Sequence, residues 1–282
     1  FRKMFNLYKL LFASIRVSFL LHQKKINVVF TTGGYISAPS ILGSKLIGIP
    51  VVLHESNAIP GKVTRLLGRF CDHVALGIPS ASEYLRGCRT SFTGTPVRSE
   101  FFLDQSLPPW VPIGDGALIV VMGGSQGAIK MNEMVRNILP WLLDKGCRVI
   151  HLTGKNDCFY KKSDKVYTHA NLVVRQFSNE ISALLQNADL AISRAGSGAI
   201  CELMVTNTPS ILIPFPSSAD QHQEQNAAYM ARYGGAVIVN QHDPEKDILK
   251  NTISNLIDSH SLAEMKSNMN NHDCFNSEKK IL

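Results

Sequence analysis

Residues 118–128, LIVVMGGSQGA, join a five-residue apolar run to a glycine-rich turn. The run predicts a buried strand at 118–122, and residues 128–145 predict a helix directly after the turn. Glycines permit a sharp turn, and they let backbone N–H groups approach an anion at the positive end of the following helix. The stretch fits neither the Walker A pattern nor G-x-G-x-x-G. Two interpretations therefore stay open, a plain strand-to-helix turn and a cradle for a phosphate.

The alternation of strand and helix continues on both sides of this stretch. Further strands are expected at 28–31, 50–54, 73–76, 148–152, 172–175, 189–192, 210–213 and 236–239, and further helices at about 35–48, 62–70, 179–186, 198–205 and 221–232. Such alternation predicts βαβ units and parallel sheets. A Pro-, Gly- and Asp-rich stretch at 107–116 lacks periodicity and is interpreted as a linker. We therefore expect an α/β protein of two doubly wound domains facing a cleft, residues 1–106 and 117–282.

The composition supports a packed core and excludes several classes of protein. The 282 residues are 45% hydrophobic and 18% charged, which rules out a disordered or collagen-like chain. Six cysteines occur at irregular spacing without a C-x-x-C pair, so neither a zinc ribbon nor a disulfide framework is indicated. A reducing cytoplasm is the expected compartment.

Positive charge is concentrated in the first part of the chain. Residues 1–110 carry 13 Lys and Arg against 5 Asp and Glu, whereas the remaining residues carry 16 against 17. A negatively charged partner is expected there, either an anionic lipid surface or a nucleic acid. No nucleic-acid-binding motif and no basic cluster with interleaved aromatics follows, so nucleic acid is not expected.

The first 25 residues favour the lipid surface. In helical projection the polar residues Arg2, Lys9, Arg16 and Gln23 form one stripe, and the apolar residues Leu7, Leu11, Ile15 and Phe19 form another. A basic amphipathic helix rich in Phe and Leu is typical of an interfacial membrane segment. The alternative is an ordinary helix packed on a domain core. Arg16 interrupts the longest apolar stretch, so no membrane-spanning helix is expected.

Three further strand ends carry residues suited to ligand chemistry. Ser193–Gly198 is a second glycine-rich helix start, and Glu202 within the helix suits the paired hydroxyls of a sugar. Two interpretations are open for Asp220–Gln223 and Asn226: the residues cap a helix, or their side chains bind a hydroxyl-rich ligand. His54–Asn57 resembles the start of a zinc-protease helix, but Ala58 stands where the second His is needed. No Asp-x-Asp pair occurs, so neither a metal nor another cofactor is expected.

Taken in order, these motifs resemble those of the MurG family of peptidoglycan N-acetylglucosaminyltransferases, inverting and metal-independent enzymes of glycosyltransferase family 28 with the GT-B fold. The resemblance extends from about residue 1 to about residue 265 and rests on five stretches: TGGYISAP at 32–39, PVVLHESN at 50–57, GTPVR at 94–98, GGSQGA at 123–128, and RAG through Glu202 at 194–202. It implies transfer of N-acetylglucosamine from UDP-GlcNAc to undecaprenyl-diphosphate-muramoyl-pentapeptide, converting lipid I to lipid II at the cytoplasmic face of the bacterial plasma membrane.

The resemblance also implies roles for individual residues. The implied donor-binding residues are Asn57, Arg98, Ser125, Gln126, Ser178, Ser197, Gly198, Glu202, His222 and Gln223. Among these, Ser125 would meet the diphosphate, Glu202 the ribose hydroxyls and Gln223 the donor sugar. Ser178 matches the position at which the family's backbone meets the uracil. His54 and Glu55 would face the acceptor and are the candidate catalytic bases.

Two departures from the family pattern limit what the resemblance implies. The family begins with a strand and a G-G-T-G-G-H loop, and this sequence starts after that point, so we expect an incomplete N-terminal domain. Ala199 stands where the family often places a hydroxyl residue. Two hypotheses follow: an active transferase whose upstream segment is absent from this sequence, or a remnant that binds UDP-GlcNAc without transferring it. A UDP-GlcNAc isomerase of related fold is a more distant alternative.

Overall fold

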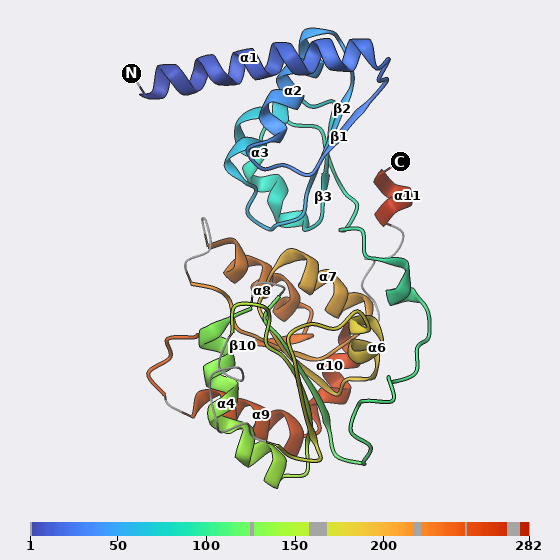
Figure 1. Ribbon diagram of the computed structural model, residues 1–282, viewed down its shortest axis with the longest axis vertical. Helices are drawn as coiled ribbons and strands as arrows, with labels where there is room; N and C mark the ends of the chain where they lie inside the picture. The colour runs from blue at the N-terminus through green and yellow to red at the C-terminus, as the bar shows by residue number, and fades with distance from the viewer. Residues whose placement is uncertain are drawn as a thin grey trace. The chain divides into compact units, whose positions relative to one another are not determined.

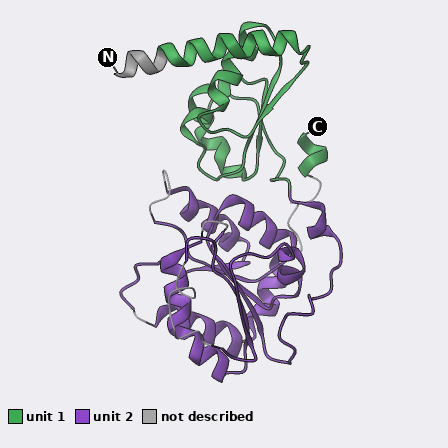
Figure 2. Cartoon of the chain, viewed as in Figure 1, with its two compact units in different colours: residues 1–96, 276–282 green, residues 97–275 purple. Residues whose placement is uncertain are grey.

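The computed structural model describes residues 2–124, 127–157, 168–216, 221–245, 247–269 and 277–281, with the backbone alone for residues 2–7. The chain divides into two compact units (Figure 2). Unit 1 consists of residues 1–96 and 276–282, and unit 2 consists of residues 97–275. Each unit is a parallel sheet covered by helices, which confirms the predicted α/β class and the pair of domains.

Unit 1 is built on a four-stranded parallel sheet in the order β1-β2-β3-β4. Its strands are β1 (Val29–Thr31), β2 (Val51–Glu55), β3 (His73–Leu76) and β4 (Thr90–Phe92). Its helices are α1 (Arg2–Gln23), α2 (Ser37–Leu46), α3 (Lys62–Leu67) and α11 (Ser277–Ile281), with 3₁₀ turns η1 (Gly68–Phe70) and η2 (Pro79–Tyr84). Ile41 of α2 packs with Val51, Leu53 and Val74 of the strands in one buried core.

Helix α1 confirms the helix predicted at the N-terminus and packs on α2 (Figure 1). The contact uses small residues: Ser14 and Ser18 are buried, and a Cβ built on Gly43 would lie 2.6 Å from the Ser14 carbonyl oxygen. The predicted apolar stripe faces away from this contact, because Ile15 is 59% exposed and Phe19 is 69% exposed. None of the described helices is both long enough and apolar enough to cross a membrane.

Unit 2 is built on a six-stranded parallel sheet in the order β10-β9-β8-β5-β6-β7. Its strands are β5 (Leu118–Met122), β6 (Arg148–Leu152), β7 (Leu172–Arg175), β8 (Leu190–Ser193), β9 (Ser210–Leu212) and β10 (Ala236–Ile238). Its helices are α4 (Ile129–Asp144), α6 (Ile181–Asn187), α7 (Ser197–Val205), α8 (His222–Arg232), α9 (Ile248–Asp258) and α10 (Ser261–Met269), with the 3₁₀ turn η3 (Ser99–Phe102).

Helices cover both faces of this sheet (Figure 1). Helices α4 and α9 pack on one face, where Val135 of α4 and Ile253 of α9 join Ile119, Val121 and Ile192 of the strands in the main core. Helices α6 and α7 lie on the other face. Every residue of β5 is buried, because a central parallel strand is covered on both sides. This burial explains the continuous apolar run in the sequence.

The strand order places a topological switch point between β5 and β8. The chain leaves β5 toward β6 and β7 on one side, and it then returns to β8 on the other side of β5. The loops that leave these two neighbouring strands therefore diverge at their carboxyl ends. In open parallel sheets, ligands bind in the crevice formed at this point.

The stretch before β5 belongs to unit 2 and packs on α6 and β7. The Gln105 backbone N–H donates to the Gln186 side-chain oxygen at 3.1 Å. The Trp110 indole donates to the Glu180 carboxylate at 2.8 Å, and the Arg175 guanidinium lies 3.7 Å from the centre of the Trp110 ring. The predicted linker at 107–116 is therefore tied to the second sheet by side-chain contacts.

Candidate functional site

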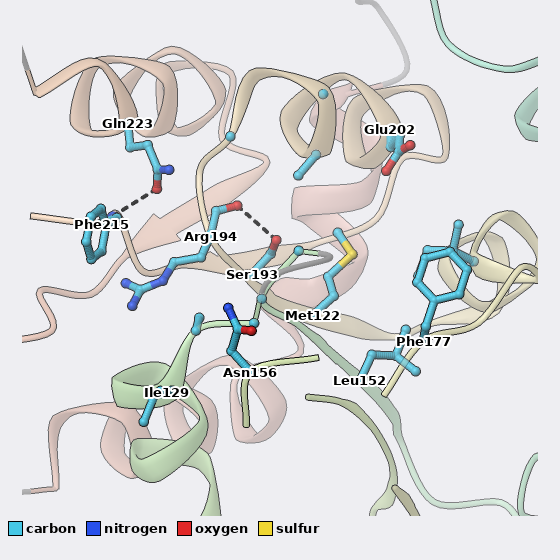
Figure 3. A pocket seen from close by; sticks show the side chains of 18 of the residues that line it. Met122, Ile129, Leu152, Asn156, Phe177, Ser193, Arg194, Glu202, Phe215 and Gln223 are labelled. Carbon is cyan, nitrogen blue, oxygen red and sulfur yellow. Dashed lines mark hydrogen bonds between the residues drawn. The ribbon is translucent and has the colours of Figure 1, made fainter. Parts of the chain in front are cut away.

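A cavity of about 760 Å³ opens in unit 2 at the carboxyl ends of its central strands. Its lining comes from the loops after β5, β6, β7 and β8, together with residues of α7 and α8 (Figure 3). The loops after β5 and β8 meet here because the two strands are neighbours in the sheet. The cavity thus occupies the switch point that the strand order defines.

The glycine-rich turn after β5 forms one wall of the cavity. Gly124 and Gly127 have φ values of 81° and 84°, a region that residues with a side chain rarely adopt. A Cβ on Gly127 would lie 2.5 Å from the Thr153 carbonyl oxygen, so the turn also packs closely against the loop after β6. Ser125, predicted to meet the diphosphate, and Gln126, predicted to bind the donor, lie outside the described residues.

The second glycine-rich turn leads into α7. Gly196 is the N-cap with extended backbone, and Ser197 begins the helix. Gly196, Gly198, Ala199 and Glu202 line the cavity. Both turns therefore reach one cavity, an arrangement that their separation in the sequence does not reveal. The start of α7 carries a partial positive charge that favours an anionic ligand.

Glu202 lies one turn into α7 beside Arg98. Its carboxylate oxygen is 3.7 Å from the Arg98 guanidinium. Burial raises the pKa of Glu202, and the neighbouring Arg98 lowers it. Arg98 also stacks on the ring of Phe101, with its guanidinium carbon 5.2 Å from the ring centre. The structure thus brings two predicted donor-binding residues together as an ion pair at the cavity.

Two further residues predicted to bind the donor, Gln223 and Ser178, also lie at the cavity. The Gln223 side-chain oxygen accepts a hydrogen bond from the Phe215 backbone N–H at 2.9 Å, which fixes the amide beside the cavity (Figure 3). Ser178 follows β7, and its hydroxyl accepts a hydrogen bond from the Glu180 N–H at 3.1 Å. Both residues line the cavity. His222 is the first residue of α8 and precedes Gln223.

Arg194 is the main residue of the cavity to which sequence reasoning gave no role of its own. Its buried guanidinium donates to the carbonyl oxygens of Ile213 and Pro214 and to the Gln241 side-chain oxygen at 2.9, 3.1 and 2.5 Å. It also lies 5.6 Å from the centre of the Phe215 ring. Burial lowers the pKa of Arg194 to about 10, so the group stays charged near neutrality. A charged residue directly after a buried strand was the available signal.

A buried polar cluster that the sequence did not indicate joins α4 to β6 and the loop after β6. The Asn132 amide donates to the Thr153 carbonyl at 2.9 Å and to the Asp157 carboxylate at 2.7 Å. Arg136 also donates to Asp157 at 2.7 Å, and the Asn132 side-chain oxygen is 3.2 Å from His151 Nε2. Since the Asn132 oxygen can only accept, Nε2 of His151 carries the proton. The cluster fixes the loop after β6 against α4.

The predicted catalytic residues lie in unit 1, at the end of β2. His54 is buried, and its Nε2 lies 2.9 Å from the Gly94 carbonyl oxygen. The buried Glu55 carboxylate accepts from the backbone N–H and side-chain amide of Asn57, both at 3.2 Å, and from the Gly61 N–H at 3.0 Å. These contacts hold the loop between β2 and α3. The catalytic roles of His54 and Glu55 stay predictions, as do the ligand contacts of the residues at the cavity.

Within the described ranges, no cluster of three or more His, Cys, Asp or Glu side chains has the arrangement of a metal site. The charged groups that line the cavity are instead Arg98, Lys130, Arg194 and Glu202, and amides and the two glycine turns lie beside them. Guanidinium groups and helix N-termini are suited to phosphate, and a carboxylate and amides are suited to hydroxyls. The side chains and helix ends at the cavity therefore fit a ligand that carries both phosphate and sugar.

Comparison with protein families assigns both parts of the chain. Residues 118–280 match the glycosyltransferase family 28 C-terminal domain, and residues 1–76 match the family 28 N-terminal domain. The chain belongs to glycosyltransferase family 28. This result confirms the family that the five motifs indicate, and the GT-B fold is confirmed with it.

Individual relatives agree with this assignment. The chain is 80% identical over 281 residues, all of this chain and 80% of the relative, to the UDP-N-acetylglucosamine–N-acetylmuramyl-(pentapeptide) pyrophosphoryl-undecaprenol N-acetylglucosamine transferase of Prochlorococcus marinus NATL2A. It is 58% identical to the transferase of the same name from Synechococcus sp. CC9902, over 90% of this chain and 70% of that one. The solved structure of Acinetobacter baumannii MurG aligns with a TM-score of 0.75 and 23% identity, over 97% of this chain and 79% of that one.

Proposed function

We propose that the chain transfers N-acetylglucosamine from UDP-GlcNAc to undecaprenyl-diphosphate-muramoyl-pentapeptide, and so converts lipid I to lipid II in peptidoglycan synthesis. The observation that carries this proposal is the 80% identity, over the whole chain, to a relative named for that transfer. The cavity of unit 2 supports it independently, because its groups suit a nucleotide sugar.

Unit 2 holds the donor in this proposal. The diphosphate lies between the glycine turn after β5, where Ser125 and Gln126 would reach it, and the start of α7, where Ser197 and Gly198 lie. The positive ends of α4 and α7 face its charge, and Arg98 adds a positive charge. No metal is required for this charge balance.

The remaining groups of the cavity suit the sugar and base of the donor. Glu202 accepts hydrogen bonds from the ribose hydroxyls, and Gln223 with His222 reaches the donor sugar. The backbone at Ser178 meets the uracil, beside the exposed ring of Phe177. Each of these contacts pairs a hydrogen-bond donor with a hydrogen-bond acceptor, which a buried polar ligand needs.

Inversion at the sugar carbon requires a base near the attacking hydroxyl. Glu55 and His54 are the proposed candidates, and Asn57 beside them is proposed to contact the donor. Glu55 accepts three hydrogen bonds, so its replacement by Gln would disturb the loop as well as remove the base. The discriminating measurement is kcat against pH. A base role predicts that the acidic limb of the profile disappears in Glu55→Gln, whereas a loop-holding role predicts a uniform decrease.

Helix α1 is proposed to bind the anionic cytoplasmic face of the plasma membrane, where the lipid-linked acceptor resides. Leu11, Ile15 and Phe19 present an exposed apolar face, and Arg16 lies 5.9 Å from the centre of the Phe12 ring. Apolar burial and electrostatic attraction both contribute to such binding, at about 1 kcal/mol for each Lys or Arg near the surface. Cosedimentation should be strong with vesicles containing phosphatidylglycerol and weak with pure phosphatidylcholine. Phe19→Ser should reduce the bound fraction without loss of UDP affinity.

A transfer assay tests the function directly. The chain is incubated with radiolabelled UDP-GlcNAc and a lipid I analogue in the presence of EDTA, with the Prochlorococcus relative as a positive control. The expected result is label in the lipid product, unaffected by EDTA. If the control transfers label and the correctly folded chain does not, the proposal is wrong.

A further inference from the structure

Trp110 contacts both ends of the loop that joins β7 to α6. At one end of the loop, the guanidinium carbon of Arg175 lies 3.7 Å from the centre of the Trp110 ring. At the other end, the Trp110 indole N–H donates to the Glu180 carboxylate at 2.8 Å. Arg175 is the last residue of β7, and Glu180 directly precedes α6. One side chain from the stretch before β5 therefore holds both ends of this loop.

The loop between these two contacts borders the cavity. Gln176, Phe177 and Ser178 line the cavity, and so does Ile181 of α6 directly after the loop. The Phe177 ring is exposed beside the cavity (Figure 3). A loop with few buried apolar contacts takes several shapes unless other contacts hold it. The contacts of Trp110 therefore bear on the shape of this part of the cavity lining.

The two tryptophans of the chain are both half-buried, but their surroundings differ. Trp141 of α4 packs against the main hydrophobic core, and Lys250 Nζ lies 5.6 Å from its ring centre. Trp110 instead contacts two charged side chains, Arg175 and Glu180. Stacking on a guanidinium and donation from the indole N–H both depend on orientation. Such contacts hold a loop in one geometry, whereas apolar packing has no preferred direction.

We propose that Trp110 is a positioning residue for the transfer reaction, because its indole holds loop 176–180 in the shape that binds the nucleotide sugar. This inference rests on the proposed function. Without the indole, only a fraction of the molecules has the competent loop shape, and the apparent affinity falls by that fraction. Trp110 does not touch the reacting sugar carbon, so its loss weakens substrate and transition state equally. The effect falls on KM and not on kcat.

The test measures Kd for UDP by isothermal titration calorimetry in EDTA, and KM and kcat in the transfer assay, all with the full chain. Trp110→Leu removes both contacts and should raise Kd and KM about tenfold. Its kcat should stay within about twofold of wild type. Trp110→Phe keeps a ring over Arg175 but loses the N–H donor, and should raise Kd about threefold. Glu180→Leu should match Trp110→Phe, whereas Glu180→Gln keeps an acceptor oxygen and should retain the wild-type Kd.

Trp141→Leu is the matched control, because it makes the same substitution in the tryptophan that packs on the core. It should lower the melting temperature at least as much as Trp110→Leu and leave Kd unchanged. In Trp141→Phe, Trp110 is the one remaining tryptophan, and its emission should change with UDP at the calorimetric Kd.

Three results would overturn the inference: an unchanged Kd in Trp110→Leu, an equal rise of Kd in Trp141→Leu, or Trp110 emission that saturating UDP does not alter. Absence of UDP binding by the wild-type chain would refute the proposed function, and the role of Trp110 with it.

Discussion

The buried imidazole of His151 should make unit 2 sensitive to acid. His151 is fully buried in the cluster with Asn132 and Asp157, and desolvation, aided by Arg136, lowers its pKa from 6.5 to about 4. At pH values between these two pKa values, the imidazole of His151 is protonated in the unfolded chain and neutral in the folded protein. The free energy of unfolding therefore decreases as pH falls from 6.5 to about 4, and this group has no effect at higher pH.

The difference between the two pKa values sets the magnitude. At 1.36 kcal/mol per pKa unit, it corresponds to about 3 kcal/mol of unfolding free energy. The perturbation is His151→Gln, which keeps an N–H donor for Asn132 and does not titrate. Other groups also titrate in this window, so the informative quantity is the difference in pH dependence between wild type and variant. Between neutral pH and pH 4, we expect the free energy of unfolding to decrease by about 3 kcal/mol less in the variant than in wild type.

Urea unfolding followed by tryptophan fluorescence measures this quantity. The chain has 2 tryptophans, Trp110 and Trp141, and both lie in unit 2, so the signal reports that unit. His169→Gln is the control, because it makes the same substitution at an exposed residue. If His151→Gln shows the same loss between neutral pH and pH 4 as wild type, the argument from burial is refuted.

Three further predictions concern single residues of unit 2 and unit 1. In urea titrations, Gly127→Ala should lower the free energy of unfolding by about 2 kcal/mol and Gly124→Ala by about 1 kcal/mol. Both glycines have a positive φ, but only the Cβ of Gly127→Ala would also collide with the Thr153 carbonyl oxygen. Equal losses in the two variants would contradict the role given to the Thr153 contact. Arg194→Met should lower the free energy of unfolding by about 3 kcal/mol and raise KM for UDP-GlcNAc, because two backbone carbonyls and a side-chain amide lose a buried hydrogen-bond donor. If the free energy of unfolding and KM both stay at wild-type values, this prediction is wrong. Burial raises the pKa of Cys71 to about 11, so mass spectrometry should find its alkylation by iodoacetamide at pH 7.5 much slower in the native protein than in urea, and equal rates would disprove its protection.

Local sequence patterns predicted many of the elements correctly. The strands expected at 73–76, 118–122, 148–152 and 172–175 have those bounds in the structure. These segments are short apolar runs bounded by polar or turn residues, so their neighbours in the chain define them. Strand β4 (Thr90–Phe92) was not predicted, because three residues with little apolar character become a strand only by pairing with β3.

For the N-terminal helix, the sequence predicted the secondary structure correctly but not the packing in the fold. The amphipathic pattern predicts the helix and its apolar stripe, but not the face by which it packs. Ser14 and Ser18 allow close approach to Gly43 of α2, and the larger apolar residues stay on the surface. Small residues give a weak signal in a hydrophobicity pattern, although they decide how closely two helices pack.

The sequence by itself determined the α/β class, the glycine turns at strand ends and, through five motifs in order, the family. Each depends on residues close together in the chain or on the order of motifs along it. Only the tertiary structure decided that the turns after β5 and β8 share one cavity, that Arg98 pairs with Glu202, and that Arg194 and His151 are buried in polar networks. Strand order and burial arise from contacts between distant segments, and a local pattern of apolar and polar residues is compatible with more than one such arrangement.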